Sequence, residues 1–419
     1  MNAAGPGAES VAADATDEEG DEEQFRLEVH AFLEATVPHK GTPPRAHASG
    51  VTRAKEFQRR LADAGLAGIT WPRQYGGRGL PGRYQRIFDR EAAAFQLPPR
   101  ALEIGLGMCG PTLLVHATEA QKAALIPPLL RGQHVWCELF SEPGAGSDLA
   151  SIQTRARRDG DVFVLDGQKL WTSGAQHSDF AACLARTNPD RPKHEGITML
   201  IVDMHAPGIS VRPLRQMTGD SHFNEVFLDG VHVPVSEVVG EVDGGWRVAR
   251  TMLAFERQAL GAMGSGGGGR GGFATLVAEA RARQLTSRPE VRQRLADLRI
   301  RQMVLRHLAG YLQAKRGAGR GAGGEASLLK LAMARFVQDS AVAAVDIAGP
   351  GALAWEASDP RGARWCAQLL SAQSASIGGG TNEIVRNVIA ERVLGLPREV
   401  EVDLDVPFRE LKVGTQREP

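Results

Sequence analysis

A change of hydrophobic period divides this chain and limits the folds open to it. Between about Val135 and Val239, apolar runs of strand length such as Val162–Leu165 and Ile197–Val202 alternate with turn residues such as Asp166–Gly167. Before and after this block the apolar residues recur at helical spacing. The order helices, strands, helices predicts an α+β protein whose middle part is an antiparallel barrel or sandwich.

The same pattern places the segment boundaries. The first 24 residues carry only acidic charges and almost no large apolar side chain, so burial cannot offset the entropy of ordering them. The C-terminal tail either packs along a neighbouring subunit or stays a solvated extension. We expect a disordered acidic tail at 1–24, an α-helical domain at 25–134, a β-domain at 135–243, a helical bundle at 244–397 and a tail at 398–419.

Charge and cysteine content exclude several classes of protein. The 419 residues hold 49 Lys plus Arg and 49 Asp plus Glu, so no basic field favours nucleic acid. The four cysteines are widely spaced and form no CxxC pair, which argues against a disulfide framework and a zinc site and favours a reducing compartment. No apolar run approaches the roughly 18 residues of a membrane span. We therefore expect a cytoplasmic protein with no metal, membrane or nucleic-acid partner.

A run of three glycines interrupts the helical pattern near the C-terminus, in the segment Ser374–Asn387, SASIGGGTNEIVRN. Glycine inside a helix costs about 1 kcal/mol relative to alanine, so the run needs a reason. It indicates either a helix boundary or a place where a ligand touches bare backbone. A second run, Gly264–Gly269, satisfies GxGxxG, but no strand precedes it, so we do not interpret it as a dinucleotide site.

Glu256 is a carboxylate in an apolar stripe. On a helical wheel of residues 245–263 the stripe contains Ala249, Met252, Leu253, Leu260 and Met263, and Glu256 lies in its middle. A carboxylate in this setting needs a raised pKa or a cationic partner. Glu256 is therefore a candidate general base, with a structural ion pair to an arginine as an equally weighted alternative.

Two polar segments in the strand block are candidate ligand-binding loops. Phe140–Asp148, FSEPGAGSD, is rich in glycine and hydroxyls that can hold a phosphate or a heterocycle. Lys169–Gly174, KLWTSG, places an aromatic ring beside two hydroxyls, as suits a planar cofactor. For either segment alone, a strand with a surface turn is the simpler explanation.

Together these segments resemble the acyl-CoA dehydrogenase family. The resemblance runs from about Phe25 to Pro397. Its motifs, in order, are GITWPRQYGGRG near residue 70, GPTLLVHATEAQK, FSEPGAGSD, DGQKLWTSGA, PLRQMTG and GGTNEIVRNVIAERVLGLP. The resemblance implies an N-terminal helical domain, a middle β-barrel domain and a C-terminal four-helix bundle. It also implies non-covalent FAD and a homo-oligomer, a dimer or tetramer.

The resemblance also implies which residues bind FAD. These are Phe140, Ser141, Gly146, Ser147, Trp171, Thr172, Ser173, Arg283, Asp346, Gly349, Thr381 and Glu383. Trp171 and Ser173 stand where the family packs against the flavin ring and hydrogen-bonds its hydride-accepting nitrogen. Arg283, Asp346 and Gly349 stand where it contacts the FAD of a neighbouring subunit, although Asp346 and Pro350 depart from the usual QxxGG motif there.

The position of the catalytic base distinguishes this chain from much of the family, in which a glutamate precedes the Gly-Thr of the C-terminal motif. This chain has Gly379 there. A minority arrangement, as in enzymes similar to isovaleryl-CoA and long-chain dehydrogenases, places the glutamate before an arginine on the helix that opens the bundle, where this chain has Glu256–Arg257. The resemblance thus implies that Glu256 is the base, that Ser147 and Arg257 contact substrate, and that the NH of Gly379 donates to the acyl carbonyl.

The implied reaction is the FAD-dependent α,β-dehydrogenation of an acyl-CoA thioester to the trans-2-enoyl-CoA, with an electron-transfer flavoprotein as electron acceptor. Three alternatives stay open: an acyl-CoA oxidase or flavin monooxygenase on the same fold, a dehydrogenase of acyl-carrier-protein thioesters, and a non-catalytic subunit of a hetero-oligomer. A monooxygenase has no need of a carboxylate at Glu256, and a non-catalytic subunit would be expected to have lost the base or the FAD contacts.

Overall fold

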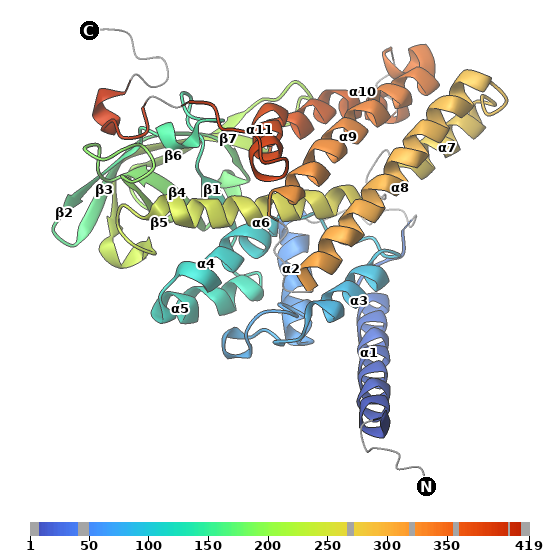
Figure 1. Cartoon of the computed structure of the whole chain (residues 1–419), viewed down its shortest axis with the longest axis horizontal. Coiled ribbons are helices and arrows are strands. Elements are labelled where there is room, and N and C mark those ends of the chain that lie inside the picture. The colour runs from blue at the N-terminus through green and yellow to red at the C-terminus, as the bar shows by residue number, and fades with distance from the viewer. Residues whose placement is uncertain are drawn as a thin grey trace. The chain divides into compact units, whose positions relative to one another are not determined.

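The computed structural model describes residues 8–40, 50–265, 272–317, 323–354, 360–400 and 403–411 (Figure 1). Most of the rejected GxGxxG run therefore lies outside the described residues. The chain divides into two compact units. One comprises Met1–Leu106 with Glu119–Val135, and the other comprises Gly107–Thr118 with Trp136–Pro419.

The first unit is helical. Its helices are α1 (Ala8–Thr36), α2 (Gly50–Asp63), α3 (Gly82–Ala92) and α5 (Glu119–Leu130). Helix α1 buries Phe25, Val29 and Leu33, which follow one another at helical spacing. The ring of Phe25 meets that of Tyr84 on α3 edge to face, with centroids 5.1 Å apart. These contacts fix the C-terminal half of α1 against α3.

Helix α1 begins inside the segment that we expected to be a disordered tail. The helix starts at Ala8, although the buried apolar residues begin only at Phe25. Residues 8–24 are rich in alanine and glutamate, which are strong helix formers and favour a helix there. The expectation considered burial alone and left out this local preference.

Within the described residues of the second unit, eight strands form one mixed sheet. They are β1 (Trp136–Leu139), β2 (Arg155–Asp159), β3 (Val162–Ser173), β4 (Phe180–Arg186), β5 (Ile197–Asp203), β6 (Ile209–Leu214), β7 (Phe223–Pro234) and β8 (Val238–Val239). The hydrogen-bonded order is β6-β7-β3-β2-β4-β5-β8, and β1 pairs with β4. Most pairs are antiparallel, as we expected, but β1 and β2 each pair with β4 in parallel. The expected order of helices, strands and helices is confirmed.

The turn expected at Asp166–Gly167 is instead part of β3. The strand continues through both residues, and its pairing with β7 shifts register between Leu165 and Gly167. A Cβ on Gly167 would lie 2.3 Å from the Thr154 side-chain oxygen, so only glycine fits at this point. The glycine that reads as a turn signal in the sequence thus permits a bulge beside a neighbouring backbone.

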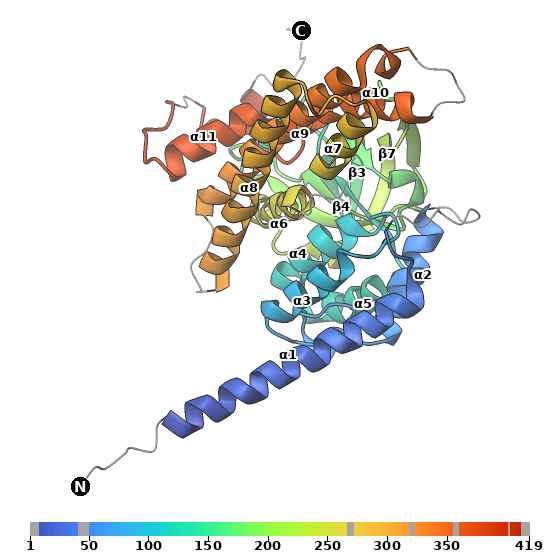
Figure 2. The same cartoon turned by 90° about the vertical axis from the view of Figure 1, so that its right-hand side faces the viewer.

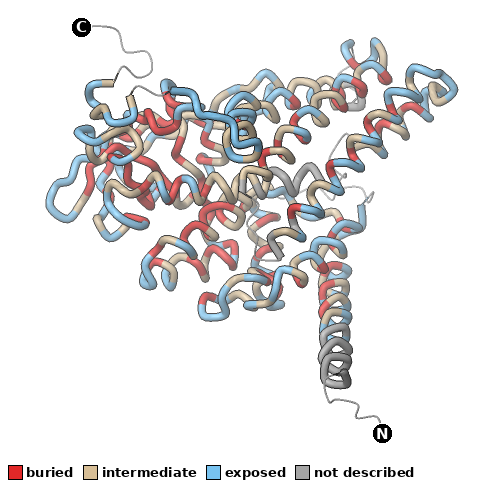
Figure 3. Tube along the Cα trace, viewed as in Figure 1, coloured by how far each residue is buried: buried red, intermediate tan, exposed pale blue. Residues whose placement is uncertain are grey.

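The sheet and the helices that follow it have separate apolar cores. Buried residues of the sheet include Leu139, Phe163, Leu165 and Val226, and β4 and β5 are almost entirely buried (Figure 3). The helices of the bundle are α6 (Gly245–Ser265), α7 (Phe273–Ala282), α8 (Pro289–Gly317), α9 (Ala326–Ala348), α10 (Pro360–Ala372) and α11 (Asn382–Arg392). Small residues on α9, among them Ala343 and Ala344, are fully buried against α7, α8 and α10 (Figure 2).

The described part of the C-terminal tail packs on the middle domain of its own chain. The ring of Phe408 lies under the Arg186 guanidinium, 3.8 Å from ring centroid to Cζ, and the Phe408 amide donates to the Arg191 carbonyl at 2.9 Å. Lys193 pairs with Asp403 at 3.6 Å. A solvated extension does not describe residues 403–411, and packing along a neighbouring subunit stays a prediction. Residues 401–402 and 412–419 lie outside the described part.

No helix in the described ranges is both long and apolar enough to span a bilayer. All four cysteines are free thiols, as expected from their spacing.

Candidate active site

A buried ion pair holds the FSEPGAGSD loop in place. Glu142 in the loop is buried, and its carboxylate accepts from Lys169 Nζ on β3 at 2.7 Å and from the amides of Gln153 and Thr154 at 2.6 and 3.0 Å. Lys169 is fully buried and also donates to the carbonyl of Phe140 at 3.1 Å. Burial raises the pKa of Glu142, but Lys169 and these hydrogen bonds outweigh burial and lower the pKa overall.

The loop and β3 bring Ser141 beside Trp171. The amide of Leu170 donates to the carbonyl of Ser141 at 2.8 Å. Leu170 directly precedes Trp171, whose side chain we assigned to the flavin. Trp171 has a φ of 61° and lies in a bulge of β3, and its side chain is 57% exposed. A large non-glycine residue with positive φ is strained, and such strain is often found at functional sites. Its ring meets Phe223 at 90°, with centroids 5.9 Å apart.

Three hydroxyls of the two candidate segments are free to bind a ligand. Within the described part of the chain, the side chains of Ser141, Ser147 and Ser173 make no hydrogen bond. An exposed indole with hydroxyl groups nearby fits a planar heterocycle that carries phosphates. The side chain of Thr172 is buried, and its hydroxyl has no partner there, so it lies on the other side of the strand from the exposed Trp171.

Glu256 lies on α6 as the wheel predicts. Ala249 and Met252 of the apolar stripe are fully buried, and Glu256 is partly buried. Burial raises the pKa of the Glu256 carboxyl. Three groups act to lower it: Arg257, the Gly379 amide through a hydrogen bond, and Lys330. The structure thus brings together the two residues that the sequence singled out independently, Glu256 and Gly379.

The glycine run is a helix boundary and also contributes bare backbone to the site. Gly379 and Gly380 have φ values of 69° and 93°, in the left-handed region that favours glycine. Helix α11 begins just after them, and its N-cap Thr381 accepts a hydrogen bond from the Ile384 amide at 3.2 Å. The helix boundary expected in SASIGGGTNEIVRN is confirmed, and the contact of bare backbone with a ligand stays a prediction. The turn also directs the Gly379 amide at Glu256.

Lys330 and Glu138 belong to this region but were missed in the sequence. Lys330 on α9 is only 2% exposed and donates to Asn382 Oδ1 at the start of α11, at 3.1 Å. Burial lowers its pKa, while Glu383 and Glu256 raise it. Glu138 on β1 lies within electrostatic range of Glu256. The only signal for Glu138 is one acidic residue within the apolar run Trp136–Phe140.

Three predicted cofactor residues lie elsewhere in the same chain. Asp346 is 16 residues along α9 from Lys330, about 24 Å at 1.5 Å per helical residue. It is exposed and pairs with Arg294 at 3.5 Å, and Gly349 follows at the C-cap of α9. Arg283, at the end of α7, pairs with Glu279 at 2.6 Å. These residues are therefore far from Glu256 of their own chain or are engaged in local pairs.

Family models match almost the whole described chain. The models described as the N-terminal, middle and C-terminal domains of acyl-CoA dehydrogenase match residues 19–133, 137–231 and 243–394. The chain belongs to the acyl-CoA dehydrogenase family. It is therefore an oxidoreductase that uses FAD, and the exposed indole of Trp171 and the free hydroxyls of Ser141 and Ser173 fit that cofactor.

Several relatives of this acyl-CoA dehydrogenase come from mycobacteria. Acyl-CoA dehydrogenase FadE34 of Mycobacterium tuberculosis is 41% identical over 344 residues, which cover 81% of this chain and 46% of FadE34. The chain thus spans about half the length of FadE34. Acyl-CoA dehydrogenase IpdE1 of the same organism is 36% identical over 386 residues, which cover 90% of this chain and 99% of IpdE1. Among solved structures, the Tcur3481-Tcur3483 steroid ACAD is 31% identical, with a TM-score of 0.76. The match covers 91% of this chain and 98% of the solved chain.

Proposed function

We propose that this acyl-CoA dehydrogenase converts an acyl-CoA thioester to the trans-2-enoyl-CoA with Glu256 as the base that removes the α-proton. The observation that carries the proposal is the meeting of a partly buried carboxyl with a backbone amide from the glycine run. Burial raises the proton affinity of Glu256, as a base that works near neutral pH requires.

The surrounding residues have separate tasks in this reaction. Arg257 and Lys330 favour the ionised form of Glu256, which is the form that accepts the proton. The Gly379 amide donates to Glu256 in this structure, and with substrate bound it would donate instead to the thioester carbonyl, where negative charge develops as the α-proton leaves. FAD, when bound, supplies the acceptor for the β-hydrogen, which leaves as hydride. The acyl group thus loses one proton to Glu256 and one hydride to the cofactor.

The proposed FAD contacts fall into two groups. One group, in the loop and strand described above, comprises Phe140, Ser141, Gly146, Ser147, Trp171 and Ser173, and the other, at the start of α11, comprises Thr381 and Glu383. Thr172 was expected in the first group, but its side chain is buried on the other side of the strand from Trp171, so we leave it out. Because Asp346 and Gly349 lie at the far end of α9 from Lys330, we assign them and Arg283 to the cofactor of a neighbouring subunit. Ser147 and Arg257 complete the proposed substrate site, and an electron-transfer flavoprotein is the proposed electron acceptor.

A panel of acyl-CoA thioesters tests the reaction and its substrate class. The FAD-loaded protein is mixed anaerobically with straight-chain, branched, aromatic and steroid side-chain acyl-CoAs, and flavin bleaching is recorded. The steroid thioester is included because one similar solved structure is named a steroid ACAD. We expect bleaching by at least one CoA thioester, with a product two hydrogens lighter. Bleaching only by an acyl-carrier-protein thioester would contradict the proposed CoA specificity.

Helix α8 supports the proposed oligomer. Ile300, Met303, Val304 and Tyr311 are exposed apolar residues that share one face of α8. We expect Ile300→Glu with Val304→Glu to shift the protein to a smaller species in sedimentation or light scattering, because two charges would have to be buried at the interface. Arg306→Glu, on another face of α8, is the matched control and should not change the mass. An unchanged mass in the double variant would place the interface elsewhere.

A further inference from the structure

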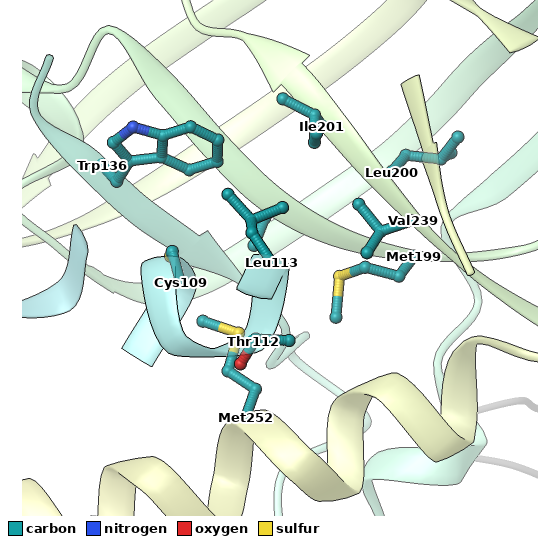
Figure 4. A pocket seen from close by; sticks show the side chains of 10 residues that line it. Cys109, Thr112, Leu113, Trp136, Met199, Leu200, Ile201, Val239 and Met252 are labelled. Atoms are coloured by element: carbon teal, nitrogen blue, oxygen red, sulfur yellow. The ribbon is translucent and has the colours of Figure 1, made fainter. Parts of the chain in front are cut away.

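Glu138 lies on the outer face of β1. Successive side chains of a strand point to opposite faces, and Cys137 and Leu139 are part of the apolar core of the sheet. Glu138 and Trp136 therefore share the other face. Figure 4 shows Trp136 at a small cavity of about 10 Å³ that Cys109 and Met252 also line. Glu138 is thus the next residue after Trp136 on the same face of β1, and Trp136 lines a cavity together with Met252 of α6.

Glu256 lies on the side of α6 that borders the same cavity. Met252 lines the cavity, and residues four apart share one face of a helix, so Glu256 is one turn along the face that Met252 presents. Trp136 and Met252 line one cavity, so the faces of β1 and α6 that carry the two carboxyl groups border the same cavity. Their charges act on each other, and the charge of Glu138 also acts on Cys109 at the cavity.

The charged groups around the two carboxyls favour a negative charge on Glu256 rather than on Glu138. Arg257 of α6 and Lys330 of α9 act on Glu256. From α4 (Gly110–His116), His116 bonds to Thr251 Oγ1 at 2.8 Å, and burial, and then the charge of Arg247, lower the pKa of its ring.

Cys109 is the last residue of a short π-helix before α4; burial, and then the charge of Glu138, raise the pKa of its thiol. Within the described residues, Glu138 has no hydrogen bond and no cationic partner. Glu256 is thus the member of the pair that can hold a negative charge at lower cost.

The pKa directions agree with this geometry. Burial, and then the charge of Glu256, raise the pKa of Glu138 well above the ordinary range. Burial also raises the pKa of Glu256, but the cations and the Gly379 amide oppose it. Two carboxyl groups whose charges interact titrate as a pair, with one proton lost before the other.

We propose that Glu138 is a positioning residue for the base: it keeps its proton while Glu256 is ionised, and loss of that proton to solvent at high pH suppresses α-proton abstraction. This inference rests on the proposed function of Glu256. A second negative charge would oppose the negative charge that develops on the thioester as the α-proton leaves. Glu138 would thus act through Glu256 without taking a proton from the substrate.

The pH dependence of flavin reduction tests the proposal. In single-turnover reactions with an acyl-CoA that bleaches the flavin, the wild-type rate should fall at both ends of the pH range, by about tenfold per pH unit beyond each limb. Glu138→Gln should keep the acid limb, lose the alkaline limb and stay within about threefold of wild type at pH 7, because glutamine cannot ionise. Glu237→Gln is the matched control, because burial also raises the pKa of that carboxyl but it has no part in the site.

Thermal stability gives a second readout that does not need turnover. A carboxyl whose pKa is raised on folding stabilises the protein fully below its unfolded pKa, and this contribution is lost as pH rises through the folded pKa. The Tm of Glu138→Gln minus that of wild type should therefore increase with pH from about 5 upward. If the glutamine variant does not fold, Glu138→Met provides the same comparison, since methionine does not ionise either.

The outcomes separate the inference from the proposed function. An alkaline limb that persists in Glu138→Gln, or a Tm difference that does not change with pH, would overturn the role of Glu138. Normal bleaching in Glu256→Gln would instead overturn the assignment of the base.

Discussion

Glu256→Gln is expected to lower the rate of substrate-dependent flavin reduction by about 10²- to 10⁴-fold, the range for loss of a positioned general base. Glutamine keeps the size of the side chain and can still accept a hydrogen bond from the Gly379 amide, but it cannot take up the α-proton. We therefore expect the variant to retain FAD and to bind acyl-CoA with little change. Anaerobic stopped-flow absorbance of the flavin, with a substrate that bleaches wild type, measures the rate.

The control for this variant is Glu237→Gln, which changes a partly buried carboxyl of the middle domain and should leave the rate unaltered. A second comparison uses Gly379→Glu, which restores a glutamate where much of the family has its base. The positive φ of Gly379 and the nearby Glu256 should make that variant much slower than wild type. If two carboxylates are tolerated there without a large loss of rate, the proposed crowding at Gly379 is wrong.

Lys169→Met is expected to lower the free energy of unfolding by about 3–5 kcal/mol, the cost of leaving one member of a buried pair without its partner. The Glu142 carboxylate would lose its 2.7 Å contact with Nζ, and the carbonyl of Leu184 would lose a donor at 2.7 Å. The free energy can be measured by denaturant unfolding of the FAD-loaded protein. Because the pair anchors the loop that holds Ser141, FAD occupancy should fall as well.

A double variant separates the loss of the pair from general damage to the core. Glu142→Gln removes the uncompensated charge but keeps an oxygen that can accept from the amides of Gln153 and Thr154. We expect Lys169→Met with Glu142→Gln to recover part of the stability that Lys169→Met loses. Equal destabilisation in the single and double variants would mean that the unpaired Glu142 charge does not cause the loss of stability in Lys169→Met.

The fold could be predicted from the sequence because hydrophobic period is a local property. The strand block and the flanking helices appear in the expected order. The errors arose where local signals are ambiguous. The glycine at 167 reads as a turn but permits a bulge inside β3, and the parallel pairing of β1 and β2 with β4 depends on contacts distant in sequence.

The site could be predicted only in part, for the same physical reason. Glu256 could be proposed as the base because an acidic residue in an apolar helical stripe is visible in the sequence, and Trp171 and Ser141 could be proposed as cofactor contacts because they belong to long motifs. Glu138 and Lys330 were missed because their importance comes from burial and from charges on other elements. A charged residue in a short apolar strand deserves the same scrutiny as one in a helical stripe.

The fate of the α-hydrogen tests the central claim most directly. In anaerobic single-turnover reactions, wild type is mixed with an acyl-CoA that carries two deuterons on the α-carbon, and flavin absorbance and product mass are recorded. The account predicts slower bleaching than with the unlabelled thioester and an enoyl product that retains one deuteron. Bleaching at an equal rate with both thioesters, together with a product that retains both deuterons, would contradict α-proton abstraction by this enzyme.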